Sequence, residues 1–203
     1  MVQVLNVGSV REPSHRVRQR NESRRLEILR AAARVFRRRG VAAAGMREIA
    51  QAAGISPGNL YHYFSGKDEI LRFCQERTVE RMQAAVDAAR GSAAERLRAI
   101  LRAHVHFMLD ELEGATAHLD VDALPVRLRG PMIAKRDAYE RAVRAVVAEG
   151  MRAGEFARGD AALVTRAMLG AVNWTARWYR PEGAQTPEDI ANALSDYLVK
   201  GLA

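Results

Sequence analysis

Residues 46–64 read MREIAQAAGISPGNLYHYF, and this stretch decides the fold class of the chain. Apolar side chains at Ile49, Ile55 and Leu60 follow helical spacing on both sides of Gly54, whose place in the turn requires a positive φ. Ser56-Pro57 then marks a helix start, because serine caps a helix and proline suits its first turn. The pattern predicts a helix-turn-helix, with helices over about residues 46–53 and 57–64.

A longer helix is expected before this pair, because two short helices cannot bury both of their apolar faces alone. Its start is predicted at Asn21 or Ser23, either of which can cap it, and its end at Gly40. Residues 1–20 show no usable helical period and are predicted to form a flexible basic arm. The sequence therefore predicts a helix-turn-helix domain over residues 21–68 and a second domain over residues 69–203.

The positive charge is concentrated at the start of the chain. The net charge is +8, yet residues 1–67 hold 13 basic and 4 acidic side chains, so they carry +9 and the remainder carries −1. This asymmetry favours a polyanion partner for the first third. A general overuse of arginine is the alternative, since only Lys67, Lys135 and Lys200 are lysines, but overuse does not explain why acids are scarce there.

The composition excludes several other classes of protein. A hydrophobic content of 48% supports a packed core, and the single cysteine, Cys74, rules out an intramolecular disulfide framework. No apolar run reaches the roughly 18 residues of a membrane span, and charge follows the mildly apolar first residues, which is the wrong order for a secretory signal. We expect a cytoplasmic protein.

Motifs of enzyme active sites are also missing from the sequence. It has no glycine-rich phosphate loop, HExxH pair, nucleophile elbow or cysteine cluster. Cys74 is interpreted as a small buried hydrophobic residue. We expect neither an enzyme nor a bound metal or cofactor.

Helical spacing continues to the end of the chain. Further helices are predicted over about residues 67–89, 93–112, 132–153 and 160–180, with a short one near 119–124 and a last one after Thr186. Pro131, Asp160 and Thr186 mark the starts of three of them. Because no period-2 alternation appears, the predicted fold is all-α with about nine helices.

The segments REIAQAA (47–53), GISPGNLYHYF (54–64) and KDEIL (67–71) resemble the DNA-binding domain of tetracycline-repressor-type (TetR) transcriptional regulators. With the first helix, the resemblance covers about residues 21–71. It implies a homodimer that binds a palindromic operator on double-stranded DNA and is released by a small-molecule effector bound in the C-terminal domain. One departure is Ala44-Gly45, which stands where the family usually has a capping Thr or Ser that touches phosphate.

The resemblance implies DNA contact by one set of residues: Arg47, Ser56, Pro57, Gly58, Asn59, Tyr61, His62, Tyr63 and Lys67. Asn59 and His62 are expected nearest the base edges, and the two tyrosines are expected to reach thymine methyl groups or phosphates. Gly58 allows close approach of the helix to the sugar-phosphate backbone. Arg47 and Lys67 are expected to clamp phosphates.

Leu60 and Phe64 are expected to pack inside the three-helix unit instead, which is also the open alternative for Tyr63. For the arginines between Arg24 and Arg39, two interpretations stay open. They form a solvated helix face, or some of them bind phosphates without sequence choice.

Candidates for the effector site come from polar residues on apolar helices. His106 and Asp110 have the i, i+4 spacing of a helical pair. The stretch NWTARWYRP (173–181) gathers both tryptophans with two arginines, and it resembles a TetR subgroup that responds to acyl-CoA thioesters of fatty-acid, steroid or aromatic-acid catabolism. The candidate ligand residues are His106, Arg136, Tyr139, Trp174, Arg177 and Trp178.

An apolar face of the last two helices is the expected dimer interface, in a four-helix arrangement. Its residues are Leu163, Ala167, Gly170, Ala171, Trp174, Ile190, Leu194, Tyr197 and Leu198. Tryptophans as interface anchors, with arginines at the rim, are an open alternative to an acyl-CoA site. Two other functions also stay open: a TetR-type regulator of an efflux pump that responds to hydrophobic drugs, and a DNA-binding protein indifferent to sequence.

Overall fold

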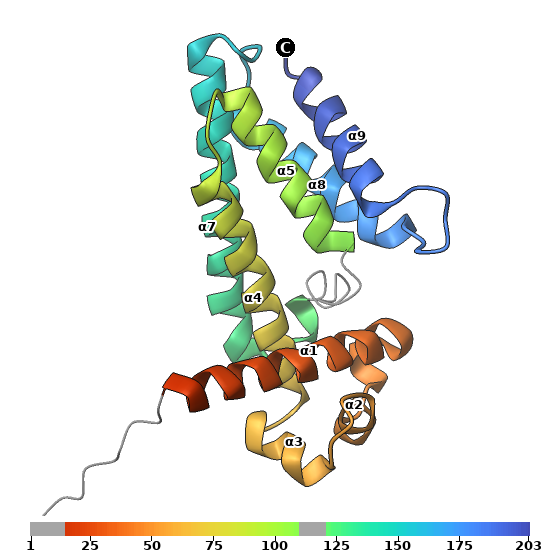
Figure 1. The fold of residues 1–203 in the computed structure, drawn as a ribbon. Helices are drawn as coiled ribbons and strands as arrows, with labels where there is room; N and C mark the ends of the chain where they lie inside the picture. Colours follow the sequence, from red (N-terminus) through yellow and green to blue (C-terminus); the bar gives the residue numbers. More distant parts are fainter. Residues whose placement is uncertain (1–14, 110–120) are drawn as a thin grey trace, which may run out of the picture.

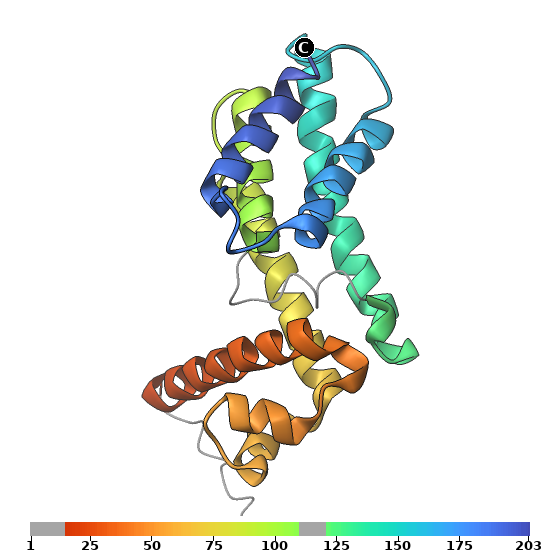
Figure 2. The same ribbon diagram turned by 90° about the vertical axis from the view of Figure 1, so that its right-hand side faces the viewer.

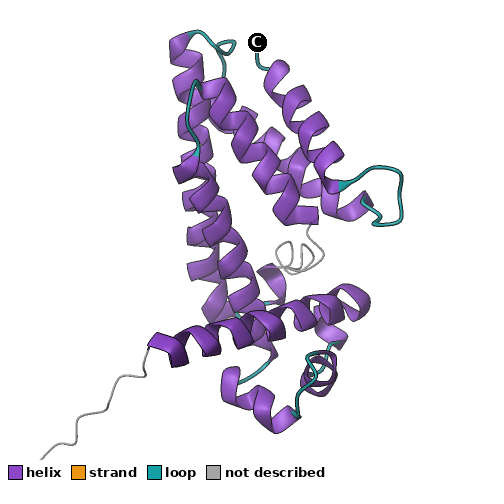
Figure 3. Ribbon diagram, viewed as in Figure 1, coloured by secondary structure: helices purple, strands orange, loops and turns teal. Residues whose placement is uncertain are grey.

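The computed structural model of the protein describes residues 15–109 and 121–203. Within these ranges all regular secondary structure is helical, so the predicted all-α class is confirmed (Figure 3). The described part holds eight α-helices and one short 3-10 helix, close to the predicted nine. Figure 1 shows α1, α2 and α3 at the base and α4 and α7 rising from it side by side toward the other helices.

The base is the predicted helix-turn-helix unit. It consists of α1 (His15–Ala43), α2 (Met46–Ala52) and α3 (Pro57–Tyr63). Gly54 in the turn has a φ of 64°, a conformation that glycine adopts without steric cost. Phe36, Ile49 and Leu60 are fully buried in its core. Each such side chain contributes about 1.5–3 kcal/mol of transfer free energy, which is what holds three short elements together.

The first helix begins earlier than the sequence predicts. It starts at His15 and not at Asn21 or Ser23, so residues 15–20 of the predicted flexible arm are helical, while residues 1–14 lie outside the described part. Arginine and glutamine have high helix propensity, which extends the helix beyond its apolar stripe. Gly40, the predicted end, has φ 76° and ψ 155°, so it interrupts the helical conformation before one further turn to Ala43.

Helix α4 (Lys67–Ala88) belongs to both parts of the molecule. Ile70 and Leu71 in its first turns are fully buried beside the helix-turn-helix unit, and Val79 and Met82 further along are buried in the upper part. Figure 2 shows α4 running without interruption from the base into the upper helices. A displacement of its upper half therefore moves its lower half as well.

The upper part is organised around α5 (Ala93–Leu109). It packs against α4, α7 (Val126–Ala153), α8 (Ala161–Trp178) and α9 (Pro187–Lys200). Its first backbone N–H groups are capped from a distant segment, because the Glu155 carboxylate accepts hydrogen bonds from Ala93 N at 3.1 Å and Ala94 N at 2.9 Å. These two bonds hold the pKa of Glu155 below its usual value.

The remaining helix starts are partly as predicted. Asp160 caps α8, and Thr186 forms a capping box with Asp189 at the start of α9. The prediction that Pro131 opens α7 is wrong, because α7 begins at Val126 and contains Pro131. Arg129 donates to the carbonyl oxygens of Leu124, at 2.7 Å, and Asp122, which stabilises the turn before the helix. A 3-10 helix, η1 (Val121–Ala123), precedes it, inside the region predicted as a short helix.

Candidate functional site

Helix α3 separates its residues into a buried and an exposed side. Leu60 and Phe64 are buried, as the sequence predicts. Asn59, Tyr61 and His62 are exposed on the opposite side, with 55% of the Tyr61 side chain accessible. These three side chains do not pack in the core of the protein. This side of α3 is therefore available to contact another molecule.

The start of α3 is fixed by its own residues. Ser56 Oγ accepts a hydrogen bond from Asn59 N at 3.1 Å. Pro57 and Gly58 are exposed, and a Cβ added to Gly58 would meet no atom of the chain within 4 Å. The fold itself therefore does not require glycine at this position.

The two predicted phosphate clamps differ in their surroundings. Arg47 is exposed on the first turn of α2, whose N-terminal residue, Gly45, provides no side-chain cap, as expected from the Ala44-Gly45 departure. Lys67 is half-buried, and its Nζ donates a hydrogen bond to the carbonyl oxygen of Ala42 at 3.0 Å. Tyr63 is half-buried between α3 and α1.

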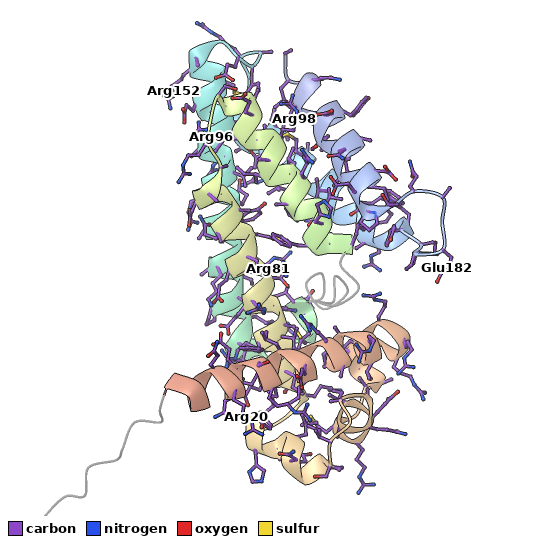
Figure 4. All side chains as sticks on the ribbon, in the orientation of Figure 1. Arg20, Arg81, Arg96, Arg98, Arg152 and Glu182 are labelled. Atoms are coloured by element: carbon purple, nitrogen blue, oxygen red, sulfur yellow. The ribbon has the colours of Figure 1, made fainter. Side chains whose placement is uncertain are left out.

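A polar recess of about 410 Å³ lies between the N-terminal part of α1 and α3. Figure 4 labels Arg20, which lies near the N-terminal end of α1 and beside α3. The residues that line the recess are Arg20, Asn21, Ser23, Arg24, Glu27, Asn59 and Tyr63. The sequence did not reveal this recess, because α1 was expected to begin only at Asn21 or Ser23 and its spatial relation to α3 is a tertiary property.

One arginine of α1 has a structural role. The Arg25 guanidinium lies 4.6 Å from the ring centroids of both Phe64 and Phe73, and 3.6 Å from the Glu69 carboxylate. Burial opposes ionisation of Glu69, but hydrogen bonds from Ser65 N and Oγ together with the charge of Arg25 outweigh it and hold its pKa below the usual value. Arg25 therefore fastens α1 to α4.

The upper part contains a cavity of about 280 Å³ between α4, α5, α7 and α8. Its apolar lining comes from Val79 and Met82 of α4, Ile133 of α7 and Leu169 of α8. Its polar lining residues are His104, Arg136, Asp137, Tyr139, Glu140 and Asn173. Two of the predicted ligand residues, Arg136 and Tyr139, are thus placed in one cavity.

His104 connects three helices at this cavity. Its Nε2 donates to Asn173 Oδ1 at 3.0 Å, and its Nδ1 accepts from the Tyr139 hydroxyl at 3.0 Å. Burial lowers the pKa of His104 from 6.5 to about 4, against the opposite effect of the Asn173 bond, so the ring is neutral at pH 7. Burial also raises the pKa of Tyr139 and lowers that of Arg136.

His104 and Asn173 were not among the candidate ligand residues. A histidine on an apolar helix is usually a satisfied interior residue, and His104 does have both ring nitrogens bonded. Its partners lie 35 and 69 residues further along the chain. No local sequence signal joins them, so only packing of the helices brings them to one cavity.

The other predicted ligand residues lie away from this cavity. The Nε2 atom of His106 lies 2.9 Å from the Glu188 carboxylate, and its predicted partner Asp110 lies outside the described residues. Trp174, Arg177 and Trp178 are exposed on α8. Trp178 instead lines a separate shallow recess of about 400 Å³ beside the α8–α9 loop, together with Tyr179 and Arg180.

The predicted interface residues divide by burial. Leu163, Trp174 and Tyr197 are 66%, 64% and 77% exposed, and Ala167, Gly170 and Ala171 are also exposed. Leu194 and Leu198 are half-buried, while Ile190 is 5% exposed and belongs to the core of its own chain. Figure 2 shows α8, α9 and their connecting loop on the side turned toward the viewer.

The described part of the chain also lacks two features that would point to other functions. No group of three or more His, Cys, Asp or Glu residues in it is arranged to hold a metal ion. None of its helices combines the length and the apolar character that a membrane crossing requires.

Comparisons with known proteins agree with this architecture. The family model "Bacterial regulatory proteins, tetR family" matches residues 28–73, and "Tetracyclin repressor-like, C-terminal domain" matches residues 90–202. The transcriptional repressor KstR2 of Mycobacterium tuberculosis is 30% identical over 187 residues, covering 89% of this chain and 93% of KstR2.

Solved structures give the same result. The TetR regulator PfmR of Thermus thermophilus has a TM-score of 0.79 and 34% identity, covering 87% of this chain and 98% of PfmR. AibR, solved in complex with isovaleryl coenzyme A and operator DNA, has a TM-score of 0.72 at 24% identity, covering 88% of this chain and 97% of AibR, and it shows similarity of fold. The chain therefore belongs to the TetR family of ligand-responsive, DNA-binding transcriptional regulators, and it is not an enzyme.

Proposed function

We propose that this protein is a homodimeric repressor that binds a palindromic operator and is released from it by an acyl-CoA or a closely related acid. The observation that carries the proposal is the course of α4. Its first turns pack in the DNA-binding unit, and Val79 and Met82 of the same helix line the cavity. A ligand that fits the cavity in only one position of α4 changes the position of α3, which is the differential binding that regulation requires.

The DNA-contacting surface of the proposal is the exposed side of α3. Asn59, Tyr61 and His62 face outward, where they can enter a major groove, and Gly58 leaves room for the DNA backbone. Ser56 and Pro57 set the direction of the helix. Arg47, Tyr63 and Lys67 are proposed to hold phosphates on the two sides of the groove.

The homodimer of the proposal joins the exposed faces of α8 and α9 in two copies. Leu163, Trp174 and Tyr197 are large apolar side chains exposed on these two helices, and covering them in a dimer would remove their apolar area from water. Small residues at Ala167, Gly170 and Ala171 allow close helix approach. We assign Trp174, Arg177 and Trp178 to this interface and its rim, because they lie outside the cavity, and leave Ile190 to the core.

The effector class is supported by the cavity and by relatives. Arg136 lines the cavity half-buried beside Asp137, whose charge favours the ionised guanidinium, so Arg136 can bind a thioester, carboxylate or phosphate oxygen. AibR binds isovaleryl coenzyme A, and KstR2 is described as a ketosteroid regulator. A large apolar drug fits this cavity poorly, because a volume of about 280 Å³ admits only one or two rings.

The test begins with selection of binding sites from random double-stranded DNA by the full chain. A palindrome is expected, and fluorescence anisotropy should then give a dissociation constant for it at least a hundredfold below that for a scrambled duplex. Equal affinity for the two duplexes would establish a sequence-indifferent binder. Tyr61→Ala and His62→Ala should weaken operator binding without lowering the melting temperature.

Release and dimerisation are tested with the same operator. A panel of CoA thioesters and free acids should raise the dissociation constant, whereas release by hydrophobic cations alone would support the efflux-pump alternative. Trp174→Asp should convert the dimer to a monomer in sedimentation analysis. Persistence of the dimer in that variant would place the interface elsewhere.

A further inference from the structure

The cavity between α4, α5, α7 and α8 has hydrogen-bonding capacity that the protein does not use. Its apolar lining of Val79, Met82, Ile133 and Leu169 suits a hydrocarbon group. The same cavity is lined by His104, Tyr139 and Asn173, of which the first two are buried. A purely apolar ligand would offer no partner to the hydrogen-bonding groups that these three residues do not use on one another.

The bonds of His104 show which atoms are left over. With Asn173 Oδ1 as the acceptor of the Nε2 proton, Nδ1 accepts the Tyr139 hydroxyl proton. The amide oxygen, both ring nitrogens and the phenolic proton are then engaged. The amide nitrogen of Asn173 keeps two N–H groups, for which the described residues provide no acceptor, and the Tyr139 oxygen keeps a lone pair.

The size of the cavity limits what enters it. An apolar cavity of about 150 Å³ holds one benzene molecule, so the observed volume of about 280 Å³ admits one or two rings. A whole coenzyme A thioester is much larger than this. The cavity therefore encloses only the end of such a ligand.

We propose that this cavity selects effectors whose enclosed end is a ring-sized group bearing a ketone or hydroxyl oxygen, which accepts a hydrogen bond from the Asn173 amide. The inference rests on the proposed function, since it takes the cavity as the effector site. A hydroxyl can in addition donate to the Tyr139 oxygen. An analogue that lacks the oxygen leaves the Asn173 donors unpaired and binds at least about tenfold more weakly.

The test uses pairs of ligands that differ in one oxygen. Cyclohexanecarboxylate is compared with 4-oxocyclohexanecarboxylate, and a decalin carboxylate with its ring ketone, as free acids and as CoA thioesters. Isothermal titration calorimetry on the full-length dimer gives the dissociation constants, and operator release is measured separately by anisotropy. At least one pair should show the tenfold preference for the ketone.

Three variants assign the preference to the proposed atoms. Asn173→Asp keeps an oxygen for the His104 Nε2 proton but removes both amide donors, so it should abolish or reverse the preference. Asn173→Leu should abolish it too, provided that its melting curve shows a folded protein. Leu169→Ala enlarges the apolar lining and serves as the matched control, which should weaken both members of a pair to a similar extent.

Each outcome has a distinct meaning. Equal affinity within every pair, no binding of any probe, or a preference that persists in Asn173→Asp would overturn the inference. If the preferred ketone binds but leaves the operator complex intact, the selectivity stands and the proposed function fails. If the ring without oxygen binds equally well and releases DNA, the proposed function stands and the selectivity fails.

Discussion

The Lys67 ammonium donates a hydrogen bond to the carbonyl oxygen of Ala42 at 3.0 Å, which joins the first residue of α4 to the last turn of α1. A carbonyl near a helix end lacks an intrahelical partner, so this bond has a structural value of about 1 kcal/mol. An ammonium has three donors, however, and two of them remain for a phosphate. Lys67 can therefore support the fold and bind DNA with the same group.

Lys67→Met should reveal both contributions. We expect a decrease of about 1 kcal/mol in the free energy of unfolding, and a slope of log affinity against log salt that is smaller by about one unit per protomer. Anisotropy at several salt concentrations measures the slope. Lys200→Met, at the far end of α9, is the matched control with no expected effect on it. An unchanged slope for Lys67→Met would restrict this residue to its structural bond.

Gly58→Ala should weaken DNA binding without lowering the stability of the fold. A Cβ at this position meets nothing in the free protein, and alanine favours a helix over glycine by roughly 0.5–1 kcal/mol, so the melting temperature should stay equal or rise. Operator affinity should fall on the order of tenfold, because the methyl group separates α3 from the DNA backbone. Full affinity in this variant would show that the close approach does not occur.

Gly150→Ala should destabilise the upper part of the molecule. An added Cβ would lie 2.3 Å from ring atoms of Phe156 and 3.0 Å from the Ala93 methyl group. Such overpacking costs about 1–3 kcal/mol and should lower the midpoint of chemical denaturation. Gly130→Ala on the same helix meets no atom within 4 Å beyond its chain neighbours, and its gain in helix propensity is opposed by Pro131, which crowds a Cβ on the preceding residue. Gly130→Ala should therefore shift the midpoint less than Gly150→Ala.

Stability should decrease in mild acid because of His104. The unfolded chain takes up a proton at this residue near pH 6.5, whereas the folded protein does so only near the lowered pKa of about 4. Between these values the unfolded state binds more protons, so acidification favours it by up to about 1.4 kcal/mol per pH unit. Denaturation at pH 7, 6 and 5 should show the loss. His104→Gln should flatten this dependence, and exposed His62→Gln should not. A dependence unchanged in His104→Gln would assign it to other groups.

Lys135 of α7 should influence how ligand binding reaches the DNA-binding unit. Its Nζ lies 3.2 Å from the carboxylates of both Glu76 and Glu80 on α4, one residue away from Arg136 in the cavity. Lys135→Met frees α4 from α7, so the ratio of operator affinities without and with effector should shrink while stability changes by less than about 1 kcal/mol. Exposed Arg141→Met is the control on the same helix. An unaltered ratio would show that the contacts of Lys135 with α4 do not contribute to the coupling between effector and operator binding.

Local chemistry accounts for the features that the sequence predicted. Gly54, Ser56 and Thr186 mark a turn and two helix starts through bonds within their own neighbourhood, and all three are present in the structure. The start of α1 at His15 was missed, because helix propensity acts there without an apolar stripe. Pro131 was misleading, because side-chain bonds from Arg129 to the turn before α7 support a helix start ahead of the proline, and a side chain's bond to that turn cannot be read from helical spacing.

The candidate sites also differ in whether they depend on one helix or on the packing of several helices. The exposed side of α3 follows from a single helix, and Leu60 and Phe64 were expected inside. The cavity depends on His104, Tyr139 and Asn173, which belong to three helices, and their meeting follows from packing alone. The two tryptophans were given a ligand role from the resemblance of residues 173–181 to acyl-CoA-responsive regulators, yet they lie on the surface outside that cavity.

The cap that Glu155 places on α5 has a consequence for synthesis on the ribosome. The DNA-binding unit packs α1, α2 and α3 with one another and with α4, so these contacts can form early in translation. Helix α5 is synthesised next, but Glu155, which caps its N-terminus, follows some 60 residues later. Helix α9, which packs against α5, ends only at Lys200. The nascent chain must therefore carry an uncovered apolar helix until it is nearly complete. A chain truncated before α9 should consequently aggregate, even though its helix-turn-helix unit is intact.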